Sequence, residues 1–241
     1  MRPSNTYHCT VTETNYPVLA EIPKLEQNRL WVEAKSPTEI SLLSHLPRRA
    51  LGIVGSRAAQ GKSRLLLERT LRALEGSNIV IISGLAKGID AEAHRMALDF
   101  GLTTIGVLAH GFDLHYPNET AGLRKEIIEK GGLIVSEYSP TIEPKPYQFV
   151  HRNRIIAALS EAVWVVQAGK SSGALNTAKW ALQLNRDLFT TPCFPGDVSL
   201  SGNEYLLQNP AVNPLWSAES LSSVWLDLFS QLRKPQMSLF H

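Results

Sequence analysis

From Leu51 onward, short apolar runs rich in β-branched residues alternate with longer amphipathic stretches. The runs that predict strands are Leu51–Gly55, Asn78–Ser83, Thr103–Leu108, Leu133–Ser136, Ala162–Gln167 and Asp187–Thr190. The stretches that predict helices are Lys62–Glu75, Asp90–Phe100, Glu119–Lys130, Asn153–Ser160 and Gly173–Asn185. Continuous apolar strands separated by long helices are typical of a parallel sheet covered on both faces. The pattern therefore predicts a doubly wound α/β domain.

The two ends of the chain are less regular than its middle. Residues 1–50 contain five prolines and one strand-like run, Leu30–Ala34, so we expect an irregular arm packed on the core. Residues 51–212 form the α/β domain. An amphipathic stretch, Ala218–Leu232, predicts a C-terminal helix within residues 213–233, and a polar tail follows in residues 234–241.

The composition fits a soluble cytoplasmic protein. Of the 241 residues, 44% are hydrophobic and the formal net charge is only +2, which excludes a typical disordered chain. No apolar run approaches the roughly 20 residues that span a bilayer, and the N-terminal residues lack the apolar core of a signal peptide. Cys9 and Cys193 have no metal-ligand spacing. We expect a reducing compartment, no membrane partner, no metal and no cofactor.

Charge is unevenly distributed along the chain. Between Ser44 and Arg72 there are seven basic residues and one acid, a local balance of +6, which leaves −4 for the rest of the chain. This segment is compatible with an anion site, although a solvated helix face would explain Arg64, Arg69 and Arg72 equally well.

The first strand-end loop, Gly55-Ser56-Arg57, offers a glycine, a hydroxyl and a cation at the start of a helix. The Gly61-Lys62-Ser63 that follows is not a P-loop, because five residues instead of four separate Gly55 from Gly61. Gly55 alone could serve only the turn, whereas Arg57 has no role in a turn. We therefore favour anion binding by this loop over ATP hydrolysis.

The second loop runs from Ser83 to Asp90 and contains Gly84, Lys87 and Gly88, which together could form an oxyanion cradle. Asp90 stands where a helix N-cap is expected, and His94 lies one turn further on the same face. A metal pair is the alternative. With no third ligand assured, capping and packing are favoured.

The third stretch, Lys145–Arg154, mixes aromatic and basic side chains without an acid, just before a predicted helix. Single-stranded nucleic acid suits such a mixture, because bases stack on Phe149 or Tyr147 while arginines meet phosphates. The alternative places Phe149 in the core and pairs Arg152 or Arg154 with a carboxylate such as Glu137. The fourth loop, Gln167–Ala178, again places glycine, serine and lysine before a helix.

In order and spacing these loops resemble the DprA/Smf family, the DNA-processing protein A group. The resemblance covers about Pro17 to Val212 and rests on Val54–Arg57, Ser83–Asp90 with Ala93-His94, Thr104–Leu108, Gly111-Phe112-Asp113, Tyr116-Pro117, Ser136-Glu137-Tyr138, Phe149, Arg152–Ile156, Ser172–Leu175, Pro195-Gly196 and Gly202-Asn203. The chain departs from the family at Val150, where proline is usual, and at Cys193-Phe194. From the length of the sequence we also expect the flanking helical and winged-helix domains that many members carry to be missing.

The resemblance implies a Rossmann-like domain that forms a homodimer, binds single-stranded DNA and helps to load the RecA recombinase in DNA uptake, transformation or repair, without a catalytic reaction. The DNA-contacting residues that it implies, together with those of the loops above, are Gly55, Ser56, Arg57, Ser83, Gly84, Lys87, Gly88, Phe149, Arg152, Asn153, Arg154, Ser172 and Gly173.

The tail Gln236-Met237-Ser238-Leu239-Phe240 resembles the pentapeptide by which bacterial proteins bind the DNA polymerase sliding clamp. Leu239 and Phe240 would be apolar anchors and Gln236 a hydrogen-bonding group. The alternative is that the two apolar side chains dock on the protein itself or on a dimer mate.

Two other functions compete with DNA binding. A phosphoribohydrolase-like enzyme would use an acid such as Glu137 or Asp90 near a ribose, but its Pro-Gly-Gly-x-Gly-Thr pattern is absent from the sequence. An adaptor that senses a small nucleotide would bind mononucleotides better than oligonucleotides.

Overall fold

The computed structural model describes residues 6–58, 61–193 and 197–227. One sheet runs through these residues in the order β1-β2-β6-β5-β4-β3-β7-β8-β9. The strands are β1 (Tyr7–Thr12), β2 (Arg29–Ala34), β3 (Ala50–Gly55), β4 (Val80–Ser83), β5 (Thr103–Val107), β6 (Leu133–Ser136), β7 (Ala162–Gln167), β8 (Asp187–Thr190) and β9 (Val212–Pro214). From β6 to β9 all neighbours are parallel, which confirms the predicted doubly wound α/β fold.

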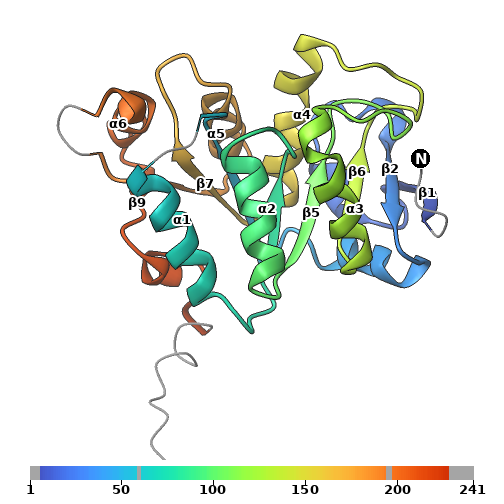
Figure 1. Ribbon diagram of the computed structural model, residues 1–241, viewed down its shortest axis with the longest axis horizontal. Helices are drawn as coiled ribbons and strands as arrows, with labels where there is room; N and C mark the ends of the chain where they lie inside the picture. The colour runs from blue at the N-terminus through green and yellow to red at the C-terminus, as the bar shows by residue number, and fades with distance from the viewer. Residues whose placement is uncertain (1–5, 59–60, 194–196, 228–241) are drawn as a thin grey trace, which may run out of the picture.

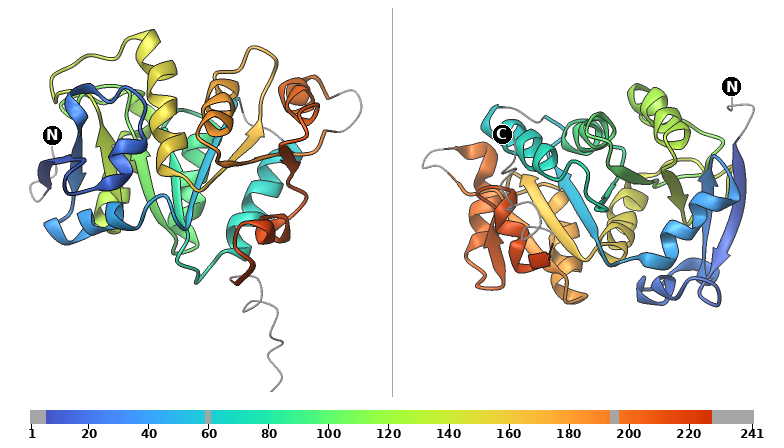
Figure 2. Two further views of the ribbon diagram at one scale, coloured as in Figure 1. Left: turned by 180° about the vertical axis from the view of Figure 1, so that it is seen from behind. Right: turned by 90° about the horizontal axis from the view of Figure 1, so that it is seen from below.

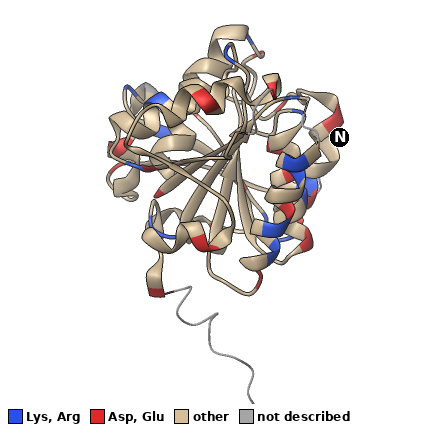
Figure 3. Ribbon diagram, turned by 90° about the vertical axis from the view of Figure 1, so that its left-hand side faces the viewer, with Lys and Arg blue, Asp and Glu red and all other residues tan. Residues whose placement is uncertain are grey.

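Helices cover both faces of the sheet (Figures 1 and 2). One face carries α1 (Gly61–Ala73), α2 (Ile89–Asp99) and α3 (Ala121–Glu129), and the other carries α4 (Pro146–Leu159) and α5 (Ala174–Gln183). The short α6 (Ser201–Leu207) lies near the β9 edge. Alternate residues of one strand enter opposite cores: Ile81 packs with Leu67 of α1, while Ile82 packs with Ile155 of α4. Figure 3 shows that charged residues lie mainly on the helices and seldom on the sheet.

The N-terminal segment is more regular than the predicted arm. It contributes β1 and β2, an antiparallel pair that extends the sheet beyond β6, and the 3-10 helices Pro17–Glu21, Glu26–Asn28 and Pro37–His45. The strand-like run 30–34 lies within β2, but β1 was not predicted. Its sequence, YHCTVT, is rich in residues that suit strands and has only one fully buried side chain, Val11, so no apolar alternation marks it.

Two predicted helices differ in the structure. The helix expected from Asn153 already begins at Pro146, because proline suits the first helical position and the Gln148 side chain accepts the Lys145 N–H. The C-terminal helix is, within the described residues, only a 3-10 helix at Ala218–Ser223. Serines there bond to nearby backbone, as when the Ser220 hydroxyl accepts from Trp216 N at 3.1 Å, which competes with α-helix formation. Residues 228–232 of that prediction lie outside the described part of the chain. The 3-10 helices Asn118–Thr120 and Val198–Leu200 complete the secondary structure.

The connections leave β3 and β7 in opposite directions, since β3 leads through α1 to β4 and β7 leads through α5 to β8. These two strands are neighbours in the sheet. A doubly wound sheet forms its ligand crevice at the carboxyl ends of strands where the winding reverses. The fold therefore points to the loops after β3 and β7.

Candidate functional site

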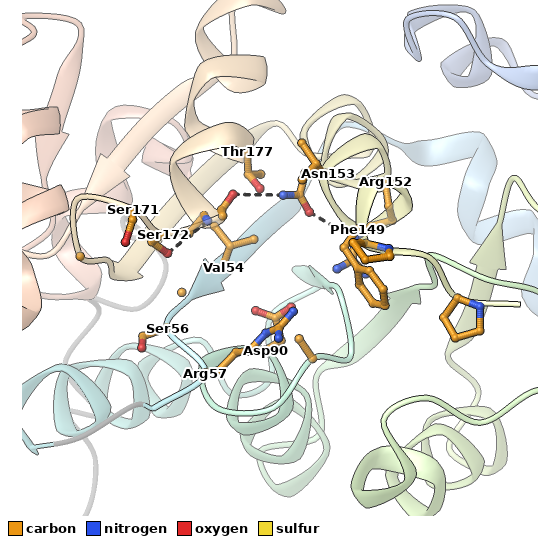
Figure 4. Close-up of a pocket in the computed structure, with 18 of the residues that line it drawn as sticks. Val54, Ser56, Arg57, Asp90, Phe149, Arg152, Asn153, Ser171, Ser172 and Thr177 are labelled. Carbon is orange, nitrogen blue, oxygen red and sulfur yellow. Dashed lines mark hydrogen bonds between the residues drawn. The ribbon is translucent and has the colours of Figure 1, made fainter.

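A pocket of about 670 Å³ opens between the loops that follow β3 and β7 (Figure 4). Its lining residues come from five parts of the chain: Val54, Gly55, Ser56, Arg57; Ala86, Asp90; Tyr116; Pro144, Pro146, Phe149, Val150, Arg152, Asn153; and Gly169, Ser171, Ser172, Gly173, Ala174, Thr177. The predicted site residues Gly55, Ser56, Arg57, Phe149, Arg152, Asn153, Ser172 and Gly173 are thus brought together. Ser83, Gly84, Lys87, Gly88 and Arg154 do not line the pocket.

The wall after β3 carries an exposed cation. Ser56 is fixed by its backbone, whose N–H donates to Gln167 O at 2.7 Å and whose carbonyl accepts from Ile89 N at 3.1 Å. The next residue, Arg57, is exposed, and its guanidinium forms no ion pair with any residue that the structure describes. A charged group that is held by its backbone but has no partner is suited to an anionic ligand.

The second loop supports this wall from behind. Gly88 has a φ of +77°, and a Cβ on it would lie 2.3 Å from Ser56 O. This glycine therefore serves the contact between two loops and does not itself approach a ligand. Lys87 pairs with Glu119 at 2.5 Å on the surface, and the Ser83 hydroxyl donates to Ile53 O at 2.6 Å. The predicted oxyanion cradle is wrong in this respect, because these polar groups are engaged within the protein.

Beneath the pocket lies a buried pair, Asp90 and Arg152. Asp90 accepts the Gly84 N–H at 3.2 Å, and Arg152 donates to Gly84 O at 2.7 Å and also to Val107 O. Burial raises the pKa of Asp90, opposed by the nearby Arg152, and burial lowers the pKa of Arg152. The predicted N-cap is wrong: α2 begins at Ile89 with Gly88 as its N-cap, and Asp90 instead holds the preceding loop.

The structure also decides between the alternatives for His94. Its side chain is fully buried, and Nδ1 lies 2.6 Å from Thr104 Oγ1. Since the Thr104 hydroxyl already donates to Ile81 O, the His94 Nδ1–H is the donor in this contact. Burial lowers the pKa of His94 to about 3. In the described ranges, no group of three or more His, Cys, Asp and Glu residues could hold a metal ion, and His94 has a packing role.

Arg154 is a correction to the predicted site. Its guanidinium binds Glu137 bidentately at 2.8 and 2.6 Å and donates to Pro23 O, Lys24 O and His151 O. All five N–H groups are therefore used within the protein, and the side chain is 1% exposed. The alternative pairing with Glu137 is the arrangement found, so Arg154 has no donor left for a phosphate.

The wall opposite Arg57 is apolar and partly aromatic. Phe149, on the first turn of α4, lies with its ring centroid 5.5 Å from that of Tyr116, at an interplanar angle of 57°. Pro144, Pro146 and Val150 continue this wall. Tyr147, by contrast, is 62% exposed and does not line the pocket. Sequence reasoning missed Tyr116, which stands 33 residues before Phe149 in an irregular loop.

The fourth loop contributes hydroxyl groups. Ser171, Ser172 and Thr177 line the pocket, and the Asn153 side chain joins the walls by donating to Gly173 O at 3.1 Å. The predicted anion site at the first turn of α5 is not supported. The N–H groups of Ala174, Leu175 and Asn176 are already bonded to Ser172 or Gly173.

Taken together, the pocket has two unlike sides. One holds Arg57 and several hydroxyls, and the other holds Tyr116, Phe149 and two prolines. Such a pocket can hold a ligand with an anionic part and a planar apolar part.

No described helix is both long and apolar enough to cross a membrane.

Comparison with known proteins gives consistent results. The family model for DNA recombination-mediator protein A matches residues 8–224. Protein Smf of Synechocystis sp. is 39% identical over 202 residues, which are 81% of this chain and 50% of that protein. The chain spans about half the length of the curated relatives it matches.

Two solved structures resemble the fold closely. DNA processing protein A from Streptococcus pneumoniae has a TM-score of 0.79 and 32% identity, over 90% of this chain and 74% of that one. DNA processing protein A from Helicobacter pylori has a TM-score of 0.75 and 26% identity, over 91% of this chain and 96% of that one.

Proposed function

The chain belongs to the DNA recombination-mediator protein A family, and we propose that its pocket binds single-stranded DNA. The observation that carries this proposal is the pairing of unlike walls in one pocket, which is lined both by Arg57, a side chain without an ion pair among the described residues, and by the aromatic Phe149. A phosphate suits the first wall and an unpaired base the second. The Helicobacter pylori relative, which is described as having a unique single-stranded DNA binding mode, supports the proposal.

Competition between single- and double-stranded DNA of equal length tests this function. A base that is paired in a duplex cannot leave its partner to contact Phe149 without unstacking, which costs a few kcal/mol. We expect single-stranded DNA to displace a labelled oligonucleotide at much lower concentration than the duplex does. Equal competition by both forms would contradict the proposal.

The enzymatic alternative has little support in the pocket. Asp90 is the one carboxylate residue among the described lining residues, and it is buried and bonded to the loop above it. Glu137, the other candidate acid, is bound on both oxygens by Arg154. Release of free base from nucleoside monophosphates would contradict a function limited to binding. Tighter binding of mononucleotides than of oligonucleotides would instead favour the sensing adaptor.

We further propose that the RecA recombinase is a partner, so that DNA held in the pocket is passed to it in DNA uptake, transformation or repair. The family to which the chain belongs, described as recombination mediators, supports this step. RecA filament formation on protein-coated single-stranded DNA is the measurement. We expect this protein to speed filament formation, and no change in rate would argue against the partnership.

A homodimer is also proposed, with its contact at a groove between α1 and the segment after β9. The groove has a volume of about 570 Å³, apolar walls that include Leu66 and Leu200, and a protruding Trp216 that is 65% exposed. Arg69 and Glu219 line it as well. Across a two-fold axis, the protruding Trp216 of each copy can enter the groove of the other, and Arg69 and Glu219 can pair between the copies.

Sedimentation equilibrium tests the dimer. The parent protein should show the mass of a dimer, and Trp216→Ser should shift it toward a monomer. Tyr205→Ser is the matched control, because Tyr205 is 62% exposed on α6 but does not line the groove. A monomeric parent would refute the dimer, and a dimeric Trp216→Ser would refute this interface.

The proposed clamp-binding peptide, residues 236–240, lies outside the described part of the chain. What supports a tether is the position of the residues that precede it. Trp225 Nε1 donates to Glu161 at 2.6 Å and Arg49 pairs with Asp227, beside the first residues of β3 and β7. The last described residues thus lie at the end of the domain opposite the pocket. Capture by an immobilised sliding clamp should be lost in Phe240→Ala, and undiminished capture would refute the motif.

A further inference from the structure

The turn formed by residues 108–117, between β5 and the 3-10 helix Asn118–Thr120, is fixed on several sides although it contains no helix or strand. The buried His110 lies with Nδ1 2.8 Å from Gly111 O and Nε2 3.1 Å from Tyr116 O. Ser136 donates to His110 O at 2.8 Å, and Arg124 donates to Leu114 O at 3.1 Å. These contacts hold the backbone at Tyr116 in one place.

Tyr116, near the end of this turn, combines an exposed aromatic ring with a backbone that is fixed by its neighbours. Tyr116 is 49% exposed and lines the pocket, and its ring packs edge-on against that of His110, with centroids 6.5 Å apart and planes at 89°. On the other side it meets Phe149 at an angle of 57°. The two rings therefore form an open corner in which each keeps aromatic surface accessible to a ligand.

We propose that Tyr116 is a base-stacking residue of the pocket, which together with Phe149 holds one unpaired nucleobase opposite Arg57. This inference rests on the proposed single-stranded DNA function and adds a contact to it. Aromatic side chains with an exposed face stack on bases of any sequence. The residue replaces Tyr147, which the sequence had suggested for this role but which does not line the pocket.

Contacts with His110 account for the position of the Tyr116 ring. A neutral imidazole has one N–H, so the His110 ring can donate to only one of the two carbonyl oxygens that face it, Gly111 O or Tyr116 O, while it lies between these two residues. It does not line the pocket and acts through Tyr116 as a positioning residue.

Titration of an oligonucleotide that carries the fluorescent base 2-aminopurine tests the stacking contact. Binding to the parent should quench the base, and Tyr116→Ala should weaken binding about 5- to 150-fold, which corresponds to about 1–3 kcal/mol for a stacked base, and reduce the quenching. Tyr116→Phe should retain both affinity and quenching. Tyr147→Ala is the matched control and should behave like the parent.

Tyr116→Leu keeps apolar bulk at the position and separates stacking from packing. It should lose quenching while its thermal unfolding stays that of the parent. Parent-like affinity and quenching in both Tyr116→Ala and Tyr116→Leu would overturn the inference and leave the DNA-binding function intact. A parent protein that binds no oligonucleotide would instead refute the proposed function itself.

Discussion

The loop that carries Arg57 and the helix that carries Arg152 and Arg154 are both basic in sequence, yet the fold uses their cations in opposite ways. Arg57 is exposed and unpaired within the described residues, whereas the two arginines of α4 are buried and bonded to carbonyl and carboxylate oxygens. One region leaves its charge exposed at the pocket, and the other uses charge to hold loops together. A count of basic residues cannot distinguish these roles.

The difference follows from what each backbone segment faces. Arg57 follows the end of a central strand, where the chain turns into solvent. The arginines of α4 lie on a helix whose inner side packs against the sheet and against the N-terminal segment. There, backbone carbonyl groups such as those of Pro23 and Lys24 accept hydrogen bonds from Arg154. A buried guanidinium is tolerated only when its donors are satisfied, so its partners define its role.

Of the substitutions that test this comparison, removal of Arg154 should lower the free energy of unfolding the most. Arg154→Ala leaves the Glu137 carboxylate buried without its partner, and we expect a loss of about 3–5 kcal/mol in the free energy of unfolding. Chemical denaturation measures this loss. A second variant, Arg154→Ala with Glu137→Gln, should recover part of the stability because it removes the stranded charge. A loss below about 1 kcal/mol in the single variant would show that the pair is not a structural element.

The second largest loss of stability should come from disturbing the contact between Gly84 and Arg152 beneath the pocket. A Cβ on Gly84 would lie 2.4 Å from Arg152 Nη2, so Gly84→Ala must displace a guanidinium that donates to Gly84 O and Val107 O. We expect a loss of about 1–3 kcal/mol in the free energy of unfolding. Gly122→Ala, in α3 with nothing within 4 Å of the added Cβ, is the control and should stabilise the helix by about 0.5–1 kcal/mol. Equal effects of the two substitutions would contradict the described packing.

Acidification should lower the free energy of unfolding through the buried His94. Per pH unit, this loss should be smaller than the losses expected for the substitutions above. Burial lowers the folded-state pKa of His94 to about 3, well below its ordinary value of 6.5. The unfolded chain therefore takes up a proton first as the pH falls, and the stability that His94 contributes is complete above about 6.5 and declines below it. The slope is about 1.4 kcal/mol per pH unit at most. Denaturation at several pH values should show this decline, and His94→Gln should flatten it; an unchanged slope would exclude His94 as its source.

Much of the core of the fold could be predicted from the sequence, because buried parallel strands such as β7, which is apolar from Ala162 to Val166, stand out. β1 could not, since an edge strand has few buried residues to mark it. The start of α4 was misplaced because the turn that contains Tyr147 and Val150, both exposed, lacks the apolar spacing of an amphipathic helix.

The lining of the pocket was predictable where residue types mark the end of a strand or the start of a helix, as for Arg57 after β3 and Phe149 on the first turn of α4. It was not predictable where tertiary contacts decide, as for Arg154, whose partners Pro23 and Lys24 lie about 130 residues earlier in the chain. Tyr116 gave no periodic signal either, because it belongs to a turn fixed by side-chain contacts. The sequence marked this turn only by Gly111-Phe112-Asp113 and the Tyr116-Pro117 pair.

The most direct test of the account is the salt dependence of single-stranded DNA binding by the parent, Arg57→Ala and Arg64→Ala. Arg64 belongs to the same basic segment but lies on α1, paired with Glu92 at 3.2 Å and away from the pocket. Plots of log K against log [salt] should flatten by about 0.7 in Arg57→Ala, one phosphate contact, and stay unchanged in Arg64→Ala. Both variants should unfold within about 0.5 kcal/mol of the parent, as surface substitutions do. Parent-like affinity and slope in Arg57→Ala, or equal losses in both variants, would contradict a pocket built around Arg57.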